Sequence, residues 1–241
     1  GLAVSGGVDS RLLTAIALRS DVDFACVHFR GPHQTRAETK WALAWFSSQG
    51  ISPLIIDSSP LDLPELAMNP QDRCYHCKRS SMARALDLLR EQGIPTLADG
   101  SNLDDHKEYR PGRKALKELG VISPLALAGF DKSAIRTAAN TLGLAWPDQP
   151  SRACLLTRFP YGRPLVQEDV ERVGKAEDDL AGLGFKLFRV RMTDRDSPEL
   201  HLDHSEEPLL QTLKAQARKT LSRHFPKGCP IRLTKRLSGF Y

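Results

Sequence analysis

The sequence contains no apolar run that approaches the roughly 18–20 residues needed to span a bilayer, and it shows no secretory leader. Aromatic residues make up 7% of the 241 residues, which leaves few side chains for stacking on nucleic-acid bases. Cysteine is scarce as well, since the chain has five, and an odd number of cysteines cannot all be paired in disulfides within one chain. We therefore expect a folded protein of the reducing cytoplasm, and not a membrane protein or a disulfide-rich secreted one.

Acidic residues are absent from the end of the chain. From Pro208 to Tyr241 there is no Asp or Glu, while eight Lys and Arg give this segment a charge of +8 against +5 for the whole chain. Such a basic end suits a partner that carries phosphate or carboxylate groups, although surface Lys and Arg are more often simply solvated. At the other end the chain opens at Gly1 without Met, so we expect the natural protein to begin earlier.

The apolar pattern of the first 145 residues alternates between strand-like and helix-like segments. The expected strands are 1–4, 24–29, 52–57 and 96–98, and the expected helices are 8–19, 36–49, 74–92 and 131–143, the last capped by Asp131. Strands that alternate with helices of this length form parallel βαβ crossovers. The pattern therefore predicts an α/β fold with a doubly wound parallel sheet.

A proline-rich stretch separates this part from the rest of the chain. After it, helices are expected at 167–183 and 208–224, and strands at 185–192, 199–202 and 231–233. We therefore predict three regions, which are an α/β domain over 1–146, a linker over 147–164 and a small α+β domain over 165–241.

A glycine-rich segment, Ser5-Gly6-Gly7-Val8-Asp9-Ser10, lies between the first expected strand and the first expected helix. Phosphate groups need several N–H donors that converge at a helix N-terminus, and glycine lets the backbone approach without a Cβ clash. Ser5 and Ser10 add hydroxyl donors, whereas Asp9 would repel phosphate and is expected to hold Mg²⁺ or to fix the loop. Neither G-x-x-x-x-G-K-[ST] nor G-x-G-x-x-G occurs. We predict a phosphate loop of another kind, the alternative being a tight turn whose polar side chains only cap the helix.

A second polar loop, Asp99-Gly100-Ser101-Asn102-Leu103-Asp104-Asp105, follows the fourth expected strand. It should lie at the carboxyl edge of the sheet, where doubly wound folds bind their ligands. The carboxylates of Asp99 and Asp104 and the amide of Asn102 suit Mg²⁺ and pyrophosphate. The alternative is an ordinary turn, because Asx-rich loops often have no ligand.

Three of the five cysteines stand in settings that suggest chemistry. Cys74 and Cys77 form a C-x-x-C pair at the start of an expected helix, where the helix dipole should make both thiols more acidic than an ordinary cysteine. Such a pair can form a redox disulfide, half of a zinc site or two ligands of an iron–sulfur cluster. Cys154 stands between Arg152 and Arg158, so it is either a nucleophile or sulfur carrier or a small buried linker residue.

Two arginines of the expected strand over 185–192, Arg189 and Arg191, alternate along the chain and therefore project from the same face. Such a pair suits recognition of a phosphate or of carboxylates, and the alternative is a pair of exposed ion pairs.

These motifs resemble those of a known superfamily. SGGVDS resembles the PP-loop of the ATP pyrophosphatases, which cleave ATP between the α- and β-phosphates to adenylate a carbonyl oxygen, and D-G-S-N resembles a second loop of the same enzymes. Nearly the whole chain further resembles the LarE family of PP-loop sulfur transferases. The motifs that carry this resemblance are SGGVDS, DRCYHCK, DGSNLDDHKEYRPG, KELGVISP, CLLTRFPYG and FRVR. The resemblance implies that ATP adenylates the carboxylates of pyridinium-3,5-biscarboxylic acid mononucleotide and that sulfur then displaces AMP.

The resemblance also implies roles for individual residues. ATP and Mg²⁺ would be bound by both loops, at Ser5, Gly6, Gly7, Asp9, Ser10, Asp99, Gly100, Asn102 and Asp104. Catalysis would fall to Cys154 at the sulfur-donor position, to Asp9 and to Arg158, and the substrate would be bound by Arg110, Arg158, Arg189 and Arg191. Glu177 matches a carboxylate near a divalent metal. His201 stands where relatives tend to have an acid, which counts against that C-terminal metal site.

The resemblance implies two routes for the sulfur. In one, a single cysteine gives up its own sulfur, and in the other three cysteines hold a [4Fe-4S] cluster, as in cluster-dependent tRNA thiolases. Cys74, Cys77 and Cys154 match the second pattern, so we expect the cluster, with the sacrificial cysteine as the alternative. An external sulfur donor and a second copy of the chain in a homo-oligomer are the other partners expected.

Two other classes of function are open at this point. A PP-loop tRNA thiolase would share the loop, the three cysteines and the basic end, but the chain has no recognisable RNA-binding module and few aromatics. A non-enzymatic nucleotide-binding or iron–sulfur scaffold would leave Cys154 and its arginines without a role. We therefore expect a small pyridinium mononucleotide as the substrate rather than a nucleic acid.

Overall fold

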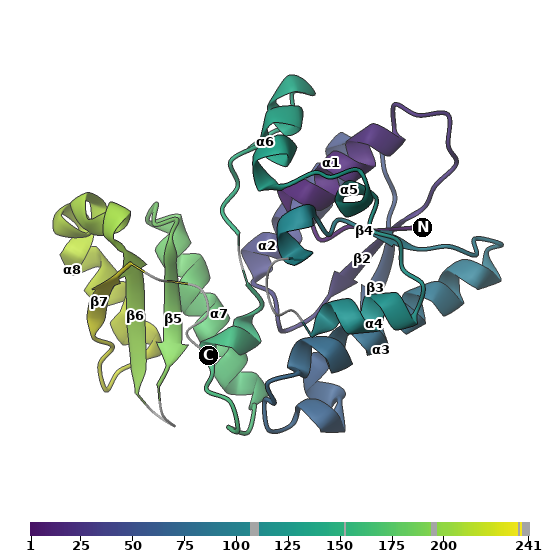
Figure 1. Cartoon of the computed structure of the whole chain (residues 1–241). Coiled ribbons are helices and arrows are strands. Elements are labelled where there is room, and N and C mark those ends of the chain that lie inside the picture. The colour runs from purple at the N-terminus through teal and green to yellow at the C-terminus, as the bar shows by residue number, and fades with distance from the viewer. Residues whose placement is uncertain (107–110, 152, 194–196, 236, 238–241) are drawn as a thin grey trace. The chain divides into compact units, whose positions relative to one another are not determined.

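The computed structural model describes the chain except for residues 107–110, 152, 194–196, 236 and 238–241. The chain divides into two compact units (Figure 1). The first consists of Gly1–Gly31, Glu38–Glu65 and Gln71–Ser151, and the second of Pro32–Ala37, Leu66–Pro70 and Arg152–Tyr241. The change from one unit to the other at residues 151 and 152 falls inside the linker predicted over 147–164. The two short loops that join the second unit from early in the sequence were not predicted.

The first unit is built on a four-stranded sheet in which every strand pair is parallel. Its strand order is β3-β2-β1-β4, with bounds β1 Leu2–Ala3, β2 Cys26–Arg30, β3 Leu54–Asp57 and β4 Ala98–Asp99. Each strand lies close to the segment expected from the apolar pattern. The predicted α/β fold with a doubly wound parallel sheet is confirmed.

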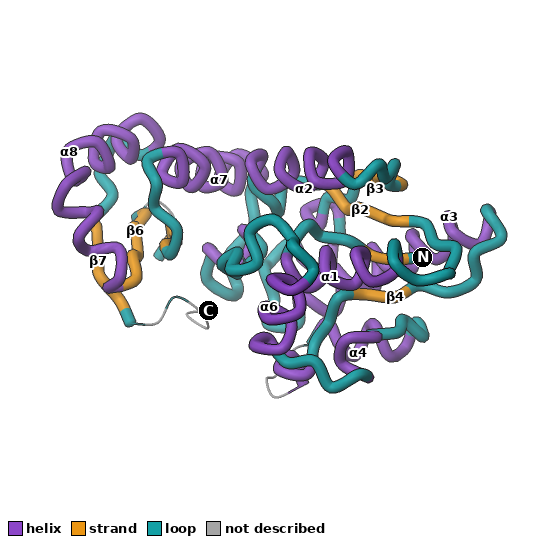
Figure 2. Tube along the Cα trace, turned by 90° about the horizontal axis from the view of Figure 1, so that it is seen from above, coloured by secondary structure: helices purple, strands orange, loops and turns teal. Residues whose placement is uncertain are grey.

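Helices cover both faces of this sheet (Figures 1 and 2). Successive residues of a strand point to opposite faces, and Leu2 accordingly joins an apolar cluster with α1 and α2, whereas Ala3 joins one with α3 and α4. Parallel sheets need this double cover because both faces are apolar. The helices are α1 Val8–Ala17, α2 Arg36–Ser48, α3 Arg73–Glu91, α4 Gly112–Glu118, α5 Pro124–Leu127 and α6 Lys132–Thr141.

Short helices make up the rest of this unit. Three 3₁₀ turns cover Pro60–Asp62, Leu103–His106 and Pro64–Leu66, the last of which ends on the first residue of a second-unit stretch. The cap predicted for α6 is confirmed, because an Asp131 carboxylate oxygen accepts the N–H of Ala134 at 2.8 Å. Both α4 and α5 were missed, since helices of 7 and 4 residues leave too short an apolar period to recognise.

The second unit combines a three-stranded sheet with two long helices. Strand β5 (Phe188–Met192) is antiparallel to β6 (Pro198–Asp203), which is parallel to β7 (Ile231–Thr234). The helices are α7 Gln167–Gly182 and α8 Glu207–His224, and 3₁₀ turns cover Leu155–Arg158 and His204–Glu206. This is the small α+β arrangement predicted for the end of the chain. Over the described residues, every helix is too short or too polar to cross a membrane.

Candidate functional site

The glycine-rich loop joins the end of β1 to the start of α1. Gly6 has φ +86°, a backbone conformation that favours glycine, and a Cβ at this position would lie 2.7 Å from the Cβ of Ala42 on α2. The loop therefore turns against α2 at a distance that only a glycine permits. Glycine was expected here so that the backbone could approach phosphate, which stays a prediction; the structure adds a second reason, the close packing against Ala42.

The loop leaves hydrogen-bond donors at the N-terminus of α1. Gly7 is the N-cap, and no described side chain caps the first turn of this helix. Helix N-termini carry N–H groups with no carbonyl partner and a partial positive charge, which together make an anion-binding site. The Ser10 hydroxyl donates to the Gly7 carbonyl at 3.0 Å and lies 3.3 Å from the Ser5 hydroxyl, so both hydroxyls sit at this end of the helix.

Asp9 is held by two partners that the sequence did not connect with it. The Lys132 ammonium donates to both carboxylate oxygens, at 2.6 and 2.8 Å, and the Asn102 side-chain amide donates to one of them at 3.1 Å. Asp9 was expected to hold Mg²⁺ or to fix the loop, and here it joins the loop to Asn102 and to the first residue of α6. Lys132 was missed, although it directly follows the N-cap residue Asp131 that the sequence identified.

The Asp99 loop packs directly on the start of α1. A Cβ at Gly100 would lie 2.9 Å from the backbone nitrogen of Ser10, so the two predicted loops touch backbone to backbone. Asp99 is buried and accepts hydrogen bonds from the hydroxyls of Ser101 and Ser123, at 2.6 and 2.7 Å, and from Lys78 at 3.4 Å. The Asp99 carboxylate therefore holds the start of this loop in place by hydrogen bonds to Ser101, Ser123 and Lys78.

Asp104 completes this edge of the first unit. The backbone N–H of Asp104 donates to the side-chain oxygen of Asn102 at 2.9 Å, and a carboxylate oxygen of Asp104 accepts the backbone N–H of Lys132 at 2.9 Å. Carboxylates of Asp9 and Asp104 thus contact the same lysine, one at its side chain and one at its backbone. Mg²⁺ in nucleotide sites is usually held by one or two carboxylates together with substrate phosphates, and these two side chains have the right chemistry.

The C-x-x-C pair lies at the start of α3 in the same unit. Cys74 is exposed, whereas Cys77 is half-buried and its pKa is raised to about 11, first by burial and then by the nearby Cys74. We expected the helix dipole to make Cys77 more acidic. The expectation is wrong for this thiol because the loss of solvation outweighs the dipole.

Cys154 belongs to the second unit, where it precedes the 3₁₀ turn Leu155–Arg158. Its carbonyl accepts both the backbone N–H and the hydroxyl of Thr157, at 2.9 and 2.7 Å. The next residue, Leu155, donates its N–H to the carbonyl of His33 at 2.9 Å. The peptide group that follows Cys154 is therefore fixed at both its carbonyl and its N–H.

Asn69 holds the other end of this turn. It is fully buried, has φ +46°, and its side-chain amide donates to the carbonyls of Phe159 and Pro160 at 2.9 and 3.0 Å. A left-handed asparagine inside a protein is uncommon and is stabilised by such bonds. The sequence gave no signal for this role, because the two segments are about 90 residues apart.

Arg158 and Glu177 form a buried, two-pronged ion pair. The guanidinium donates to both carboxylate oxygens, at 2.7 and 3.0 Å, and one of these oxygens also accepts the Val190 N–H at 2.9 Å. Burial alone would raise the pKa of Glu177, but the charge and hydrogen bonds of Arg158 outweigh it and hold that pKa below its usual value. A divalent cation does not fit here, since both oxygens are engaged and Arg189 adds further positive charge.

Arg189 and Arg191 are also buried, and both donate to backbone carbonyls. Arg189 bonds Phe188 at 2.6 Å, and Arg191 bonds Thr157 at 3.1 Å as well as the carbonyl of Leu237. The antiparallel register places Arg189 opposite His201 and Arg191 opposite Glu199. Glu199, which the sequence did not single out, accepts hydrogen bonds from His201 at 3.0 Å and from Arg232 at 2.7 Å. Arg110 lies outside the described residues.

Among the described residues, no group of three or more His, Cys, Asp or Glu side chains is placed to hold a metal ion. The structure gathers the expected nucleotide-binding residues and the C-x-x-C pair in the first unit. It gathers Cys154, Arg158, Glu177, Arg189 and Arg191 in the second. The soft thiols of Cys74, Cys77 and Cys154 have the donor chemistry that an iron–sulfur cluster requires, and their role as its ligands stays a prediction.

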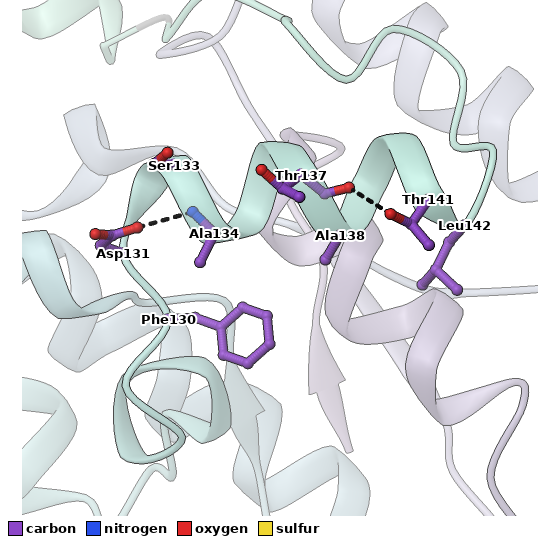
Figure 3. Close-up of a pocket in the computed structure, with 8 residues that line it drawn as sticks. All are labelled: Phe130, Asp131, Ser133, Ala134, Thr137, Ala138, Thr141 and Leu142. Carbon is purple, nitrogen blue, oxygen red and sulfur yellow. Dashed lines mark hydrogen bonds between the residues drawn. The ribbon is translucent and has the colours of Figure 1, made fainter.

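A groove of about 700 Å³ runs beside α6 (Figure 3). It is lined by Phe130 and by small or short side chains of α6, among them Ala134 and Ala138. None of the residues expected to bind nucleotide or sulfur lines it.

Comparison with known proteins identifies relatives that cover most of the chain. No family model matches the chain. An uncharacterised protein from Synechocystis sp. is 37% identical over 193 residues, which cover 79% of this chain and 71% of that protein. The pyridinium-3,5-bisthiocarboxylic acid mononucleotide synthase of Lactiplantibacillus plantarum is 30% identical over 194 residues, which cover 79% of this chain and 70% of that enzyme. An uncharacterised protein from Methanocaldococcus jannaschii is 28% identical over 190 residues, with 79% and 72% covered.

Proposed function

Because the chain belongs to the LarE family, the family of the pyridinium-3,5-bisthiocarboxylic acid mononucleotide synthase, we propose that it is an ATP-dependent sulfur transferase. Its substrate is pyridinium-3,5-biscarboxylic acid mononucleotide. A substrate carboxylate attacks the α-phosphate of ATP, which forms an acyl adenylate and releases pyrophosphate. Sulfur then attacks the acyl carbon and AMP leaves, so that each carboxylate becomes a thiocarboxylate.

One observation carries the nucleotide half of this proposal. No side chain of the described residues caps the N-terminus of α1, and the Asp99–Asn102 loop is packed against it at backbone contact. The first-turn N–H groups and the hydroxyls of Ser5 and Ser10 bind the phosphates in this proposal. Lys132 supplies the positive charge at the same edge, and Asp9 and Asp104 would hold Mg²⁺ against the phosphates.

The sulfur half rests on Cys154 and its fixed turn. The sulfur is delivered to the acyl carbon at Cys154, whose carbonyl is held by the Thr157 hydroxyl, and that hydroxyl in turn accepts a hydrogen bond from Arg158. A [4Fe-4S] cluster held by Cys74, Cys77 and Cys154 would supply an open iron for a hydrosulfide ligand, which allows repeated turnover. In the alternative of the same reaction, Cys154 gives up its own sulfur and the protein turns over once.

A PP-loop tRNA thiolase is the second candidate, and helix α8 favours it. Lys214, Arg218 and Lys219 of this helix are exposed, and none of them forms a salt bridge with a described residue. Phosphate backbones attract such a surface in a salt-dependent manner. The two candidate functions differ in their substrate, which is the pyridinium mononucleotide in one and tRNA in the other.

The test measures pyrophosphate and AMP release with ATP and either the pyridinium mononucleotide or tRNA, using anaerobically purified protein. We expect release with the mononucleotide only. Asp9→Asn should abolish it, because the link between loop, Asn102 and Lys132 is broken, whereas Asp21→Asn at an exposed position should not. No release with the mononucleotide would refute the proposal, and release with tRNA alone would replace it with the thiolase. Iron and sulfide contents distinguish the cluster from the sacrificial cysteine.

A further inference from the structure

Arg11 is a buried cation in the first turns of α1, directly after the glycine-rich loop. Its side chain is fully buried, and its Nε–H donates to the carbonyl of Gly6 at 3.0 Å. A guanidinium keeps its charge in a protein, so an interior position is costly unless every N–H is well placed. The residue therefore contacts the loop from the interior of the unit.

The other end of the guanidinium binds a distant segment of the same unit. Its terminal nitrogens donate to the carbonyl of Ala145, to the carbonyl of Trp146 at 3.1 Å and to the side-chain oxygen of Gln149 at 3.0 Å. Among the described residues no carboxylate pairs with Arg11. Backbone carbonyls and one amide therefore solvate this charge, and every one of them belongs to either the loop or the 145–149 segment.

Two tryptophans reinforce the same connection. Arg11 lies over the ring of Trp41, with 5.6 Å to the ring centroid, and Trp41 meets Trp146 edge to face at 5.6 Å. Trp146 has φ +53°, which is unfavourable for a bulky residue and persists only where its surroundings impose it. The 145–149 segment is thus held in one strained conformation against α1 and α2.

The segment 145–149 lies shortly before Cys154 in the chain. Gln149 precedes Cys154 by five residues, so their Cα atoms are separated by at most about 18 Å, whatever the path between them. Fixing residues 145–149 fixes the point from which the chain leaves for Cys154. Arg11 therefore connects the loop expected to bind ATP to residues 145–149, which we call the root of the Cys154 segment because they directly precede it in the chain.

We propose that Arg11 is a positioning residue that couples the two half-reactions, an inference that rests on the proposed function. It keeps the root of the Cys154 segment at a fixed place relative to the loop where the acyl adenylate forms. Water competes with sulfur for this intermediate and converts it to the carboxylic acid and AMP. A loosened segment raises the share of hydrolysis while the adenylation step continues.

The decisive measurement is the amount of thiocarboxylate formed per AMP released. Arg11→Lys keeps the charge but cannot bond both ends, and we expect thiocarboxylate per AMP to fall roughly tenfold or more, since small misplacements have effects of this size. Pyrophosphate formation should stay within about threefold of the wild-type rate. Arg19→Lys is the matched control, because Arg19 lies just beyond the end of α1 and, among the described residues, bonds only the carbonyls of Ala15 and Leu142. An unchanged ratio in Arg11→Lys, or a parallel loss of pyrophosphate formation, would overturn the proposal.

A second readout does not depend on the substrate. Hydrogen–deuterium exchange of peptides that cover residues 143–151 should be faster in Arg11→Lys and unchanged in Arg19→Lys. Gln149→Ala removes one anchor without burying a new group and should show a smaller increase, which keeps the test usable if the Arg11 variant folds poorly. If wild-type protein releases no AMP with the mononucleotide, the proposed function fails. Unchanged exchange over 143–151 in both variants separately refutes the anchoring role of Arg11.

Discussion

The glycine-rich loop of the first unit and the Cys154 turn of the second unit are built in opposite ways. The loop packs closely against Ala42 through Gly6 and against Gly100 of the second polar loop through Ser10, and no described side chain caps the N-terminus of α1. In the Cys154 turn the carbonyls of Cys154, Thr157 and Phe159 each accept hydrogen bonds from side chains. A loop that receives a ligand needs donors left over, whereas a turn that presents one atom needs its backbone fixed.

The difference also appears in where charge is placed. Around the loop, Lys132 and Asp9 are partly exposed. Breaking their ion pair when a phosphate binds should therefore cost little free energy. In the turn, Arg158 and Glu177 are almost completely buried, and separating them would leave an unpaired charge in the interior. The first arrangement is suited to exchange of ligands and the second to rigidity.

Removing the sulfur atom tests the comparison most severely. Cys154→Ser should lower thiocarboxylate formation at least about 10³-fold, because a hydroxyl neither holds transferable sulfur nor ligates iron well. Pyrophosphate release in the first turnover should persist, since the loop lies in the other unit. Cys229→Ser is the control, as Cys229 is a half-buried thiol of the same unit whose pKa burial raises to about 12. Loss of pyrophosphate release in Cys154→Ser would show that the two regions are not separable.

Breaking the buried ion pair tests the rigidity of the turn. Glu177→Gln leaves the Arg158 charge without its partner and should lower the free energy of unfolding by about 3–5 kcal/mol, measured by chemical denaturation. Glu171→Gln, in the more exposed pair with Lys175, should cost less than about 1 kcal/mol. A double variant, Arg158→Met with Glu177→Leu, should regain much of the lost stability. A small effect of Glu177→Gln would contradict the contrast drawn here.

Adding a single methyl group tests the close packing behind the loop. Gly100→Ala brings a Cβ to 2.9 Å from the Ser10 nitrogen, and we expect a loss of about 1–3 kcal/mol in stability together with roughly tenfold weaker ATP binding by calorimetry. At Gly182 a Cβ would meet nothing within 4 Å, so Gly182→Ala should be neutral or slightly stabilising. Equal ATP affinities in the two variants would mean that this contact does not shape the loop.

The smallest expected effect concerns the pH dependence of the turn. His33, whose carbonyl accepts the Leu155 N–H, has its pKa lowered to about 4 by burial, and its Nδ1 has no hydrogen-bond partner within the part of the chain that the structure describes. The unfolded chain takes up a proton near pH 6.5 and the folded chain does not, so stability should fall as the pH drops from about 6.5 to 4. His33→Asn should flatten this part of the stability profile, whereas His204→Asn at an exposed position should not. An unaltered profile in His33→Asn would place the histidine outside the packed turn.

Much of the fold followed from the sequence because its signals are local. The apolar periods located the sheet strands and long helices. The glycines of the loop were attributed to close approach to phosphate, which stays a prediction, and the packing of Gly6 against α2 was not foreseen. Residues whose roles depend on distant segments were missed. Lys132 meets Asp9 across 123 positions, and Asn69 meets the Cys154 turn across about 90. The acidity expected for Cys77 failed for a related reason, since burial depends on tertiary packing that the sequence does not reveal.

The second unit is assembled from three stretches of chain, and this discontinuity restricts how the protein can be made and cut. Residues 32–37 supply the carbonyl that receives Leu155, and residues 66–70 supply the amide of Asn69. A fragment expressed from residue 153 onward would contain Cys154 and lack both supports. During synthesis, residues 32–37 and 66–70 are made long before residues 152–241, on which they pack. The second unit can therefore fold only after the last third of the polypeptide has been synthesised.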